Sequence, residues 1–490
     1  MERASASATK LSRLFDWLDR PGMYRATALL LAGFYIATSL FISFHRWLWY
    51  DEIFTAIASR MPDFHTLWKS LSDSTQQIPP LYFVITRICD QLLHHADGGI
   101  RIPSAIALGV GMYITFDIVR RLTNGLYGLI AMMLLTTSFV TYYGYEARPY
   151  AIYFMLASAA LWLWVSTCHQ SKWAAAAFGL LFLVGMAIHY FFVLCLVPFG
   201  LLALAGRRIF HPKVIAGSIG ILGAVLLFFP LISSSGAAAG GTYFNWAPPT
   251  MVALQSIYLE FFPRVTIPLV LFAVVAALTA KRRELQVVPM SDGERVSWLF
   301  FTIPLASFAL ALAVTQMFYH RYMIGAIPGI VVSVTCILWR HFGHSRALSL
   351  ALLFLLGGFG IGKQLITLRH MDHIQVPGAG DCQEQTRQLL DLERAFQSDG
   401  RRHTALTDEH LFLQAWYYSK DKQRYEYVAA TPWTLSKYAA LRILPVTAML
   451  AEARETAVIA PGTHLAETLQ QSGARLKIRF VEPFYVIYLE

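Results

Sequence analysis

Long apolar stretches, separated by short polar connections, occupy the first three quarters of the chain. The first stretch, Tyr24–Phe44, is long enough to cross about 30 Å of hydrocarbon as a helix. Basic residues precede it and no small-residue cleavage site follows, so we expect an uncleaved anchor whose N-terminus lies inside. The same pattern predicts further membrane-spanning helices at Ile102–Val119, Leu126–Tyr142, Tyr150–Thr167, Trp173–His189, Tyr190–Leu204, Val214–Ile232, Val265–Ala280, Val296–Met317, Tyr322–Trp339 and Ala347–Ile366.

A shorter apolar segment, Pro80–Leu93, decides the topology. Its apolar side chains share one helical face and its polar ones, Arg87, Asp90 and Gln91, share another, which predicts a helix along the membrane interface. If this segment does not cross, all basic connections lie on the side of the N-terminus, as the positive-inside rule requires. We therefore expect a mainly α-helical polytopic membrane protein with about eleven transmembrane helices. The basic connections are Arg120–Arg121, Arg207–Lys213, Lys281–Arg283 and Arg340–Arg346.

Two regions then lie outside. The first outer loop, about residues 45–100, is expected to contain interfacial helices at Asp51–Leu71, broken at Pro62, and at Pro80–Leu93. In the more polar C-terminal region, TAVIAPG and RLKIRFVEPFYVIYLE predict strands and THLAETLQQSG predicts a helix, so we expect a small soluble α/β domain. The expected organisation is a cytoplasmic segment at 1–23, a transmembrane domain at 24–366 and a periplasmic domain at 367–490.

Composition agrees with this picture. The chain has 490 residues, of which 56% are hydrophobic and 14% are charged, whereas soluble proteins have about 25% charged residues. These values exclude a soluble multidomain enzyme, a disordered regulator and a disulfide-stapled secreted module. The net charge of +10 follows the pattern of membrane orientation, so we expect no nucleic-acid partner. The five cysteines show neither metal spacing nor a disulfide framework.

Ionisable side chains in membrane spans are unfavourable by about 2.5–3.5 kcal/mol each at mid-membrane, so those beside the spans suggest a function. In the predicted topology, several that are far apart in sequence share the outer face. Aromatic residues surround each of them. This common location predicts an active site there. The residues are Asp51 and Glu52, Glu146 and Arg148, His189 and Tyr190, and Arg321.

Each of these residues also has a purely structural interpretation. Asp51 could cap a helix, and Arg148 could pair with Glu146 or with an interfacial phosphate. Arg321 could extend to lipid headgroups. His189 could pack at a helix end, or could act as a donor or ligand at the outer face. The motif GGFGIGK at Gly357–Lys363 imitates a phosphate loop, but no Ser or Thr follows the lysine, and close helix packing explains it better.

An ordered series of short motifs carries a family resemblance. WYDEIF, IPPLYF, IRIPSAI, YEARPYAI, IHYF and HRYMIGAIPG follow one another between Trp47 and Pro328. In this order they resemble bacterial relatives of the protein O-mannosyltransferases. These are GT-C-type glycosyltransferases that use lipid-phosphate sugars, a group similar to the lipid A aminoarabinose transferase.

The resemblance implies a catalytic cavity at the outer membrane face, where a monosaccharide passes from a polyprenyl phosphate carrier to an acceptor. It implies that Asp51 is the general base and that Glu52 supports it or orients the substrate. It also implies that Arg321 holds the donor phosphate. The remaining residues expected to bind donor or substrate are Tyr145, Glu146, Arg148, Tyr150, His189, Tyr190 and Tyr322.

The chemistry of such a reaction requires the same kinds of group. A lipid phosphate leaves as a stable anion, so the reaction needs a base for the acceptor proton and cations for the phosphate charge. Arginine suits the phosphate because its planar fork binds two oxygens and stays charged. A single carboxylate acting as base predicts inversion at the anomeric carbon.

One departure concerns metals. Many relatives have an ionisable residue before the Pro-Pro pair of the second interfacial helix, whereas this chain has Ile78 before Pro79. The cofactor is therefore left unknown: the sequence does not support a divalent cation, and we assign no metal ligand. The expected partners are a polyprenyl-phosphate-sugar donor, the bilayer, and a lipid, glycan or protein acceptor. The short loops indicate a bacterial inner membrane, with the catalytic face in the periplasm.

Two other functions stay open. An O-antigen polymerase or ligase would use a diphosphate-linked donor and arginines in large outer loops, so the acidic pair Asp51–Glu52 argues against it. A non-enzymatic lipid-sugar transporter or flippase should place ionisable groups deep inside several spans. In this sequence such groups gather near one face, with Asp117 as the main internal exception.

Overall fold

The structure is a computed structural model of the whole chain. It describes residues 22–72, 78–167, 171–207, 210–239, 247–262, 289–371, 374, 382–396, 403–406, 409–420, 422, 425–429, 443–445, 456–460, 467, 470, 475–481 and 484–489. The chain divides into two compact units. The helical unit comprises residues 1–44 and 78–369, and the mixed unit comprises residues 45–77 and 370–490. The first part of the predicted outer loop is thus grouped with the C-terminal region.

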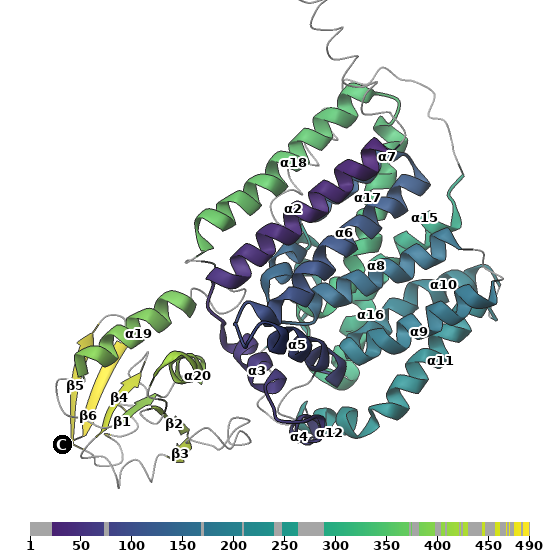
Figure 1. Cartoon of the computed structure of the whole chain (residues 1–490). Helices are drawn as coiled ribbons and strands as arrows, with labels where there is room; N and C mark the ends of the chain where they lie inside the picture. The colour runs from purple at the N-terminus through teal and green to yellow at the C-terminus, as the bar shows by residue number, and fades with distance from the viewer. Residues whose placement is uncertain are drawn as a thin grey trace, which may run out of the picture. The chain divides into compact units, whose positions relative to one another are not determined.

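Helices make up the described part of the helical unit (Figure 1). Its elements are α2 (Met23–His45), α5 (Pro80–Leu92), η1 (Gly99–Arg101), α6 (Ile102–Leu122), α7 (Gly125–Thr137), η2 (Phe139–Tyr145), α8 (Tyr150–Ser166), α9 (Lys172–Ile188), η3 (Tyr190–Leu196), α10 (Val197–Ala205), α11 (Pro212–Leu227), α12 (Phe229–Ala239), α13 (Met251–Glu260), α15 (Asp292–Leu299), η5 (Phe300–Thr302), α16 (Ile303–Leu310), η6 (Ala311–Thr315), η7 (His320–Ala326), α17 (Ile327–Phe342) and α18 (Arg346–Arg369).

The length and composition of these helices confirm a mainly helical polytopic membrane protein. Within the described residues, 5 helices are long and apolar enough to cross a membrane, or up to 6 if a bent pair forms one span. Four shorter apolar helices accompany them: Tyr150–Ser166, Lys172–Ile188, Tyr190–Ala205 and Pro212–Leu227. The total of about eleven spans stays a prediction, and the span expected at Val265–Ala280 lies outside the described residues.

Glycines allow some of these helices to approach closely. A Cβ atom on Gly220 of α11 would lie 2.1 Å from the carbonyl oxygen of Gly179 of α9. A Cβ atom on Gly360 of α18 would lie 1.8 Å from Oγ1 of Thr136 of α7. Small residues at such contacts let helix backbones pack tightly without a hydrophobic driving force. The packing interpretation of the GGFGIGK motif agrees with this contact.

The predicted helix Leu126–Tyr142 is interrupted. α7 ends at Thr137 and η2 begins at Phe139, and the two segments are bent by 74°. Ser138 between them is extended, and its hydroxyl accepts a hydrogen bond from the backbone N–H of Val140. Lys363 of α18 donates hydrogen bonds to the Ser138 carbonyl oxygen at 2.7 Å and to Thr141 Oγ1 at 2.8 Å. These contacts stabilise the break.

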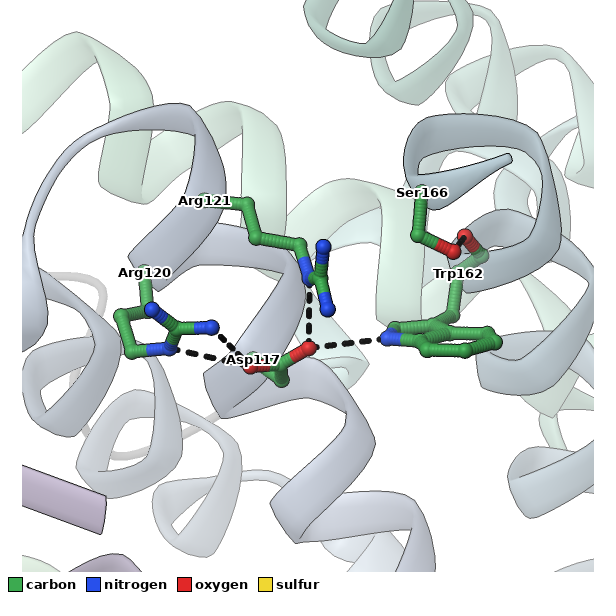
Figure 2. A network of polar contacts seen from close by, with 5 residues as sticks. All are labelled: Asp117, Arg120, Arg121, Trp162 and Ser166. Atoms are coloured by element: carbon green, nitrogen blue, oxygen red, sulfur yellow. Dashed lines mark hydrogen bonds and ion pairs between the residues drawn. The ribbon is translucent and has the colours of Figure 1, made fainter. Parts of the chain in front are cut away.

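A polar network lies at the end of α6 (Figure 2). The Asp117 carboxylate accepts hydrogen bonds from Arg120 at 2.6 Å, from Arg121 at 2.6 Å and from the indole N–H of Trp162 at 2.9 Å. Nearby, the buried Lys213 donates to the carbonyl oxygens of Leu163 and Thr167, in the last turn of α8 and just beyond it. We call this the basic end of the helical unit.

The described part of the mixed unit contains four helices and a six-stranded sheet. The predicted helix break at Pro62 is confirmed, because α3 spans Tyr50–Ser59 and α4 spans Phe64–Ser72. The sheet has the order β3-β2-β1-β4-β6-β5, with β1, β2, β3 and β4 parallel and with β6 antiparallel to β4 and β5. The remaining elements are α19 (Cys382–Phe396), β1 (His403–Leu406), α20 (Glu409–Tyr418), β2 (Tyr425–Ala429), β3 (Ile443–Pro445), β4 (Thr456–Ala460), β5 (Leu476–Val481) and β6 (Phe484–Leu489).

The strands expected in TAVIAPG and in the last sixteen or so residues agree with β4, β5 and β6. The register of the final hairpin pairs Val481 with Phe484 and Leu476 with Leu489. Nearly all of the helix expected at residues 463–473 lies outside the described residues. The sequence patterns did not predict β1, β2 and β3 or the two helices α19 and α20.

Candidate active site

Three segments of the helical unit meet around Tyr153, in the second turn of α8. The Tyr153 hydroxyl donates a hydrogen bond to the carbonyl oxygen of Phe191 at 3.1 Å and also lies 3.4 Å from the carbonyl oxygen of Tyr322. It therefore joins α8, η3 and η7, which begin at residues 150, 190 and 320. This contact brings together the neighbourhoods of three predicted site motifs. We call this part of the molecule the site end of the helical unit.

Aromatic rings form the packing of the site end. His189 stacks on Tyr153 with ring centroids 5.2 Å apart, and its centroid lies 5.5 Å from Tyr150 and 6.1 Å from Tyr322. Phe191 stacks on Tyr322 at 4.8 Å. His189 follows the last residue of α9 and is 5% exposed.

Two cationic side chains lie within this aromatic group. The Arg321 guanidinium carbon is 5.7 Å from the ring centre of Tyr150, 5.4 Å from that of Tyr319 and 5.6 Å from that of Tyr322. Arg148 and Arg321 are both close enough to His189 to act on it electrostatically. Arg148 is buried and Arg321 is half-buried. The buried Glu146 carboxylate belongs to the same group, so the two arginines and this acid together carry one net positive charge.

The connection between η2 and α8 fixes Glu146 and Arg148. Glu146 is extended and buried, and its carbonyl oxygen accepts a hydrogen bond from the backbone N–H of Arg148 at 2.8 Å. Ser104 of α6 donates to the Arg148 carbonyl oxygen at 3.2 Å. Just before α6, the buried Arg101 donates to the carbonyl oxygen of Ser43 in α2 at 2.9 Å. The end of α2 and the Glu146–Arg148 segment therefore lie at the same end of the helical unit.

The structure adds a residue to the site end that the sequence patterns did not single out. Glu260, at the end of α13, lies 3.4 Å from His320, which is next to Arg321. The hydrogen bond from His320 holds the pKa of the Glu260 carboxyl below its ordinary value. The His320 ring also lies edge-on to Phe139 of η2, with centroids 4.9 Å apart. Glu260 lies in the aromatic segment YLEFF, which contains no distinctive signal for a functional residue.

The predicted acidic pair, Asp51 and Glu52, belongs to the mixed unit and occupies the first turn of α3. Glu52 is fully buried, accepts a hydrogen bond from the Trp49 backbone N–H at 3.2 Å and pairs with Arg46 at 3.2 Å. Its carboxylate therefore stabilises the start of the helix. Asp51 is half-buried and is not the N-cap, because Trp49 occupies that position. The two carboxylates thus have different environments.

The helical unit brings together six of the predicted donor- or substrate-binding residues. Tyr145 contacts Tyr142 edge-on at 5.4 Å, and Tyr190 is half-buried at the start of η3. Among the residues that the structure describes, no group of three or more His, Cys, Asp or Glu side chains could hold a metal ion. The six donor- or substrate-binding residues that the helical unit brings together are Glu146, Arg148, Tyr150, His189, Arg321 and Tyr322.

Comparison with known proteins adds independent information. Residues 77–234 match the family model described as dolichyl-phosphate-mannose-protein mannosyltransferase. This segment contains Tyr145, Glu146, Arg148, Tyr150, His189 and Tyr190, whereas Asp51 and Arg321 lie outside it. No curated protein sequence matches the chain.

The fold resembles crystal structures of ArnT from Cupriavidus metallidurans. The apo structure has 11% sequence identity and a TM-score of 0.61, and the match covers 95% of this chain and 98% of that one. The structure bound to undecaprenyl phosphate has 10% identity and a TM-score of 0.58, covering 93% and 97%. The family match thus covers one segment of the chain, and over nearly its whole length the chain shares its fold with ArnT.

Proposed function

We propose that this enzyme transfers one monosaccharide from a polyprenyl-phosphate carrier to an acceptor hydroxyl or amine on the periplasmic side of a bacterial inner membrane. The observation that carries the proposal is the pair of cations, Arg148 and Arg321, among buried aromatic rings at the site end. A group of this kind suits a phosphate that stays attached to a membrane-embedded lipid chain. The undecaprenyl phosphate bound to ArnT, which shares this fold, supports the same donor class.

Arg321 is proposed to bind the donor phosphate. Its guanidinium lies beside three tyrosine rings, which orient the planar fork and leave it charged. When the glycosidic C–O bond breaks, the electron pair goes to the phosphate oxygen, and the arginine stabilises the resulting negative charge. Arg148, buried nearby, adds to the positive potential at the same place.

Asp51 is proposed to be the general base. It removes the proton from the acceptor hydroxyl or amine while the acceptor atom bonds to the anomeric carbon, so one displacement inverts that carbon. Glu52 is fully buried whereas Asp51 is half-buried, so Asp51 is the more accessible of the two carboxylates and the better candidate. In the sequence, Asp51 follows Phe44 after only six intervening residues.

The transporter alternative loses its main support. Asp117, the internal charge that the sequence left unexplained, binds two arginines and an indole N–H at the end of α6. Such a group has a structural role at a helix end, whereas a translocation path needs ionisable groups along the spans. The polymerase alternative gains no observation in its favour.

Substitution of Asp51 tests the proposed base. In membranes from cells with and without the gene, mass spectrometry of lipids, glycans and proteins identifies the polyprenyl-phosphate sugar consumed and the product formed. With that assay, Asp51→Asn should lower the rate of transfer on the order of 10²- to 10⁴-fold, the contribution typical of a general base. Asp63→Asn is the matched control, because Asp63 is an exposed carboxylate of the same loop at the start of α4. Near-normal transfer by Asp51→Asn contradicts the assignment.

A further inference from the structure

Two neighbouring tyrosines of the C-terminal region contact both ends of the helix that contains Asp51. Tyr417 and Tyr418 lie in the last turn of α20, and α20 packs against α3 within the mixed unit. The two helices are far apart in the sequence. Their contact is therefore a tertiary feature that no local pattern around Asp51 encodes.

The first contact lies just before α3. The backbone N–H of Leu48 donates a hydrogen bond to the Tyr418 hydroxyl at 2.5 Å. The Trp47 ring stacks on the Tyr418 ring with centroids 4.6 Å apart, and the Arg387 guanidinium of α19 lies over Trp47 at 5.6 Å. Since Leu48 is 1% exposed, its N–H has little access to water, and the tyrosine supplies the acceptor that a buried donor requires.

The second contact lies at the other end of α3. Arg60 follows the last residue of the helix, and its Nη1 donates a hydrogen bond to the Tyr417 hydroxyl at 2.5 Å. The Arg60 guanidinium also lies 5.9 Å from the centre of the Tyr417 ring. One turn of α20 therefore contacts both the entry and the exit of α3.

These contacts matter because α3 has only 10 residues. Helices shorter than about 12 residues are marginal in water, so their orientation depends on tertiary packing. Asp51 lies three residues after Leu48, in the first turn. A small rotation of α3 about its axis would move the Asp51 carboxylate, while the Glu52–Arg46 pair alone fixes only the first turn.

We propose that Tyr417 and Tyr418 are positioning residues for the general base: they orient α3 so that the Asp51 carboxylate meets the acceptor. The inference rests on the proposed function, in which Asp51 is the base. It gives the C-terminal region a catalytic contribution, because this region supplies two hydroxyl groups that fix the helix of the first outer loop.

The double variant Tyr417→Phe/Tyr418→Phe tests the proposal in the full-length enzyme. It removes both hydroxyl acceptors and keeps both rings. The expected result is a fall of about 10- to 100-fold in kcat, the effect of a misplaced catalytic group, with the KM for the donor unchanged. Tyr488→Phe is the matched control, a tyrosine of β6 in the same unit, and it should leave both parameters unchanged. An unchanged kcat in the double variant overturns the proposal.

A double-mutant cycle distinguishes positioning from a general loss of folding. The two tyrosine substitutions are combined with Asp51→Asn. If the tyrosines act through Asp51, adding Tyr417→Phe/Tyr418→Phe should change the residual transfer rate of Asp51→Asn by less than about twofold. If the two tyrosine substitutions lower the transfer rate by the same factor with Asp51 present and in Asp51→Asn, the inference is overturned while the proposed base stays intact. Near-normal transfer by Asp51→Asn alone contradicts the base itself, so the two failures are distinguishable.

Amide hydrogen exchange gives a readout that does not depend on turnover. Exchange of residues 48–60 should become faster in Tyr418→Phe and Tyr417→Phe, and not in Tyr488→Phe, with the rest of the chain unaffected. If the double variant Tyr417→Phe/Tyr418→Phe inserts poorly into the membrane, exchange in the two single variants still tests whether each tyrosine fixes α3. Unchanged exchange in these residues overturns the proposal.

Discussion

Two neighbouring acidic residues of this protein lie in different surroundings. Asp51 and Glu52 are adjacent, and the sequence identified them as one acidic pair. Glu52 points toward Arg46 and the Trp49 backbone N–H, whereas Asp51 is half-buried on another side of α3. Trp49 is not a residue type that signals a helix start, so the sequence could not predict that Glu52 completes this turn.

Asp117 shows the same dependence on partners. A carboxylate that is 8% exposed is stable as an anion only with several donors, and Arg120, Arg121 and Trp162 provide them (Figure 2). Two of the donors are on its own helix, at the following positions i+3 and i+4, and could be anticipated from the sequence. The third lies on α8, and only the packing of α6 against α8 reveals it.

Asp117→Asn should lower the thermal stability of the detergent-solubilised protein. The substitution removes the charge that neutralises two arginines, and the expected loss in the free energy of unfolding is about 1–3 kcal/mol. Asp292→Asn is the matched control: its pair with Arg295 is exposed and should contribute at most about 1 kcal/mol. Melting curves of the two variants decide this, since equal shifts would mean that the buried network adds nothing beyond a surface pair.

Among the elements, the interrupted helix at Ser138 was the feature hardest to predict. The sequence from Leu126 to Tyr142 is mostly apolar and contains no charged residue, so its pattern predicted one helix. The hydroxyls of Thr136, Thr137 and Ser138 each donate to a carbonyl oxygen three residues earlier, which competes with the regular helix. The ammonium group that completes the break comes from Lys363, 225 residues away.

Lys363 is expected to affect transfer through the segment that it supports. Lys363→Met removes the donors to Ser138 and Thr141 and should lower the transfer rate about tenfold, because η2 leads directly into Tyr145 and Glu146. Lys363→Arg keeps a cationic donor and should recover most of the rate. Lys172→Met, at the exposed start of α9, controls for loss of a lysine. The interpretation fails if Lys363→Arg is as slow as Lys363→Met.

At the scale of the whole molecule, sequence reasoning succeeded where the signal is local in the chain. Apolar length predicted the polytopic helical fold, and the ordered motifs identified residues that the helical unit brings together. It made no prediction that residues 45–77 group with the C-terminal region. That grouping depends on contacts such as Leu48–Tyr418, which join residues 370 positions apart, and periodicity contains no information on them.

The distribution of charge within the helical unit leads to a prediction about topology. α8 runs from the site end at Tyr150 to Ser166 beside the basic end, a rise of about 25 Å at 1.5 Å per residue, close to the thickness of the hydrocarbon core. Arg120, Arg121 and Lys213 lie at the basic end, so the positive-inside rule assigns that end to the cytoplasm and the site end to the periplasm.

Cysteine labelling in intact cells measures this orientation. In a cysteine-free version of the chain, Asp63→Cys should react with a membrane-impermeant maleimide, because its loop follows α2 at the site end. Thr123→Cys, just after α6 at the basic end, should react only after permeabilisation. If both cysteines reacted from the same side, the loop of Asp63 would lie on the side of the basic end, across the membrane from the site end of α6. The arginines of the site end would then lie in a different compartment from Asp51, and a single catalytic site built from them would be impossible.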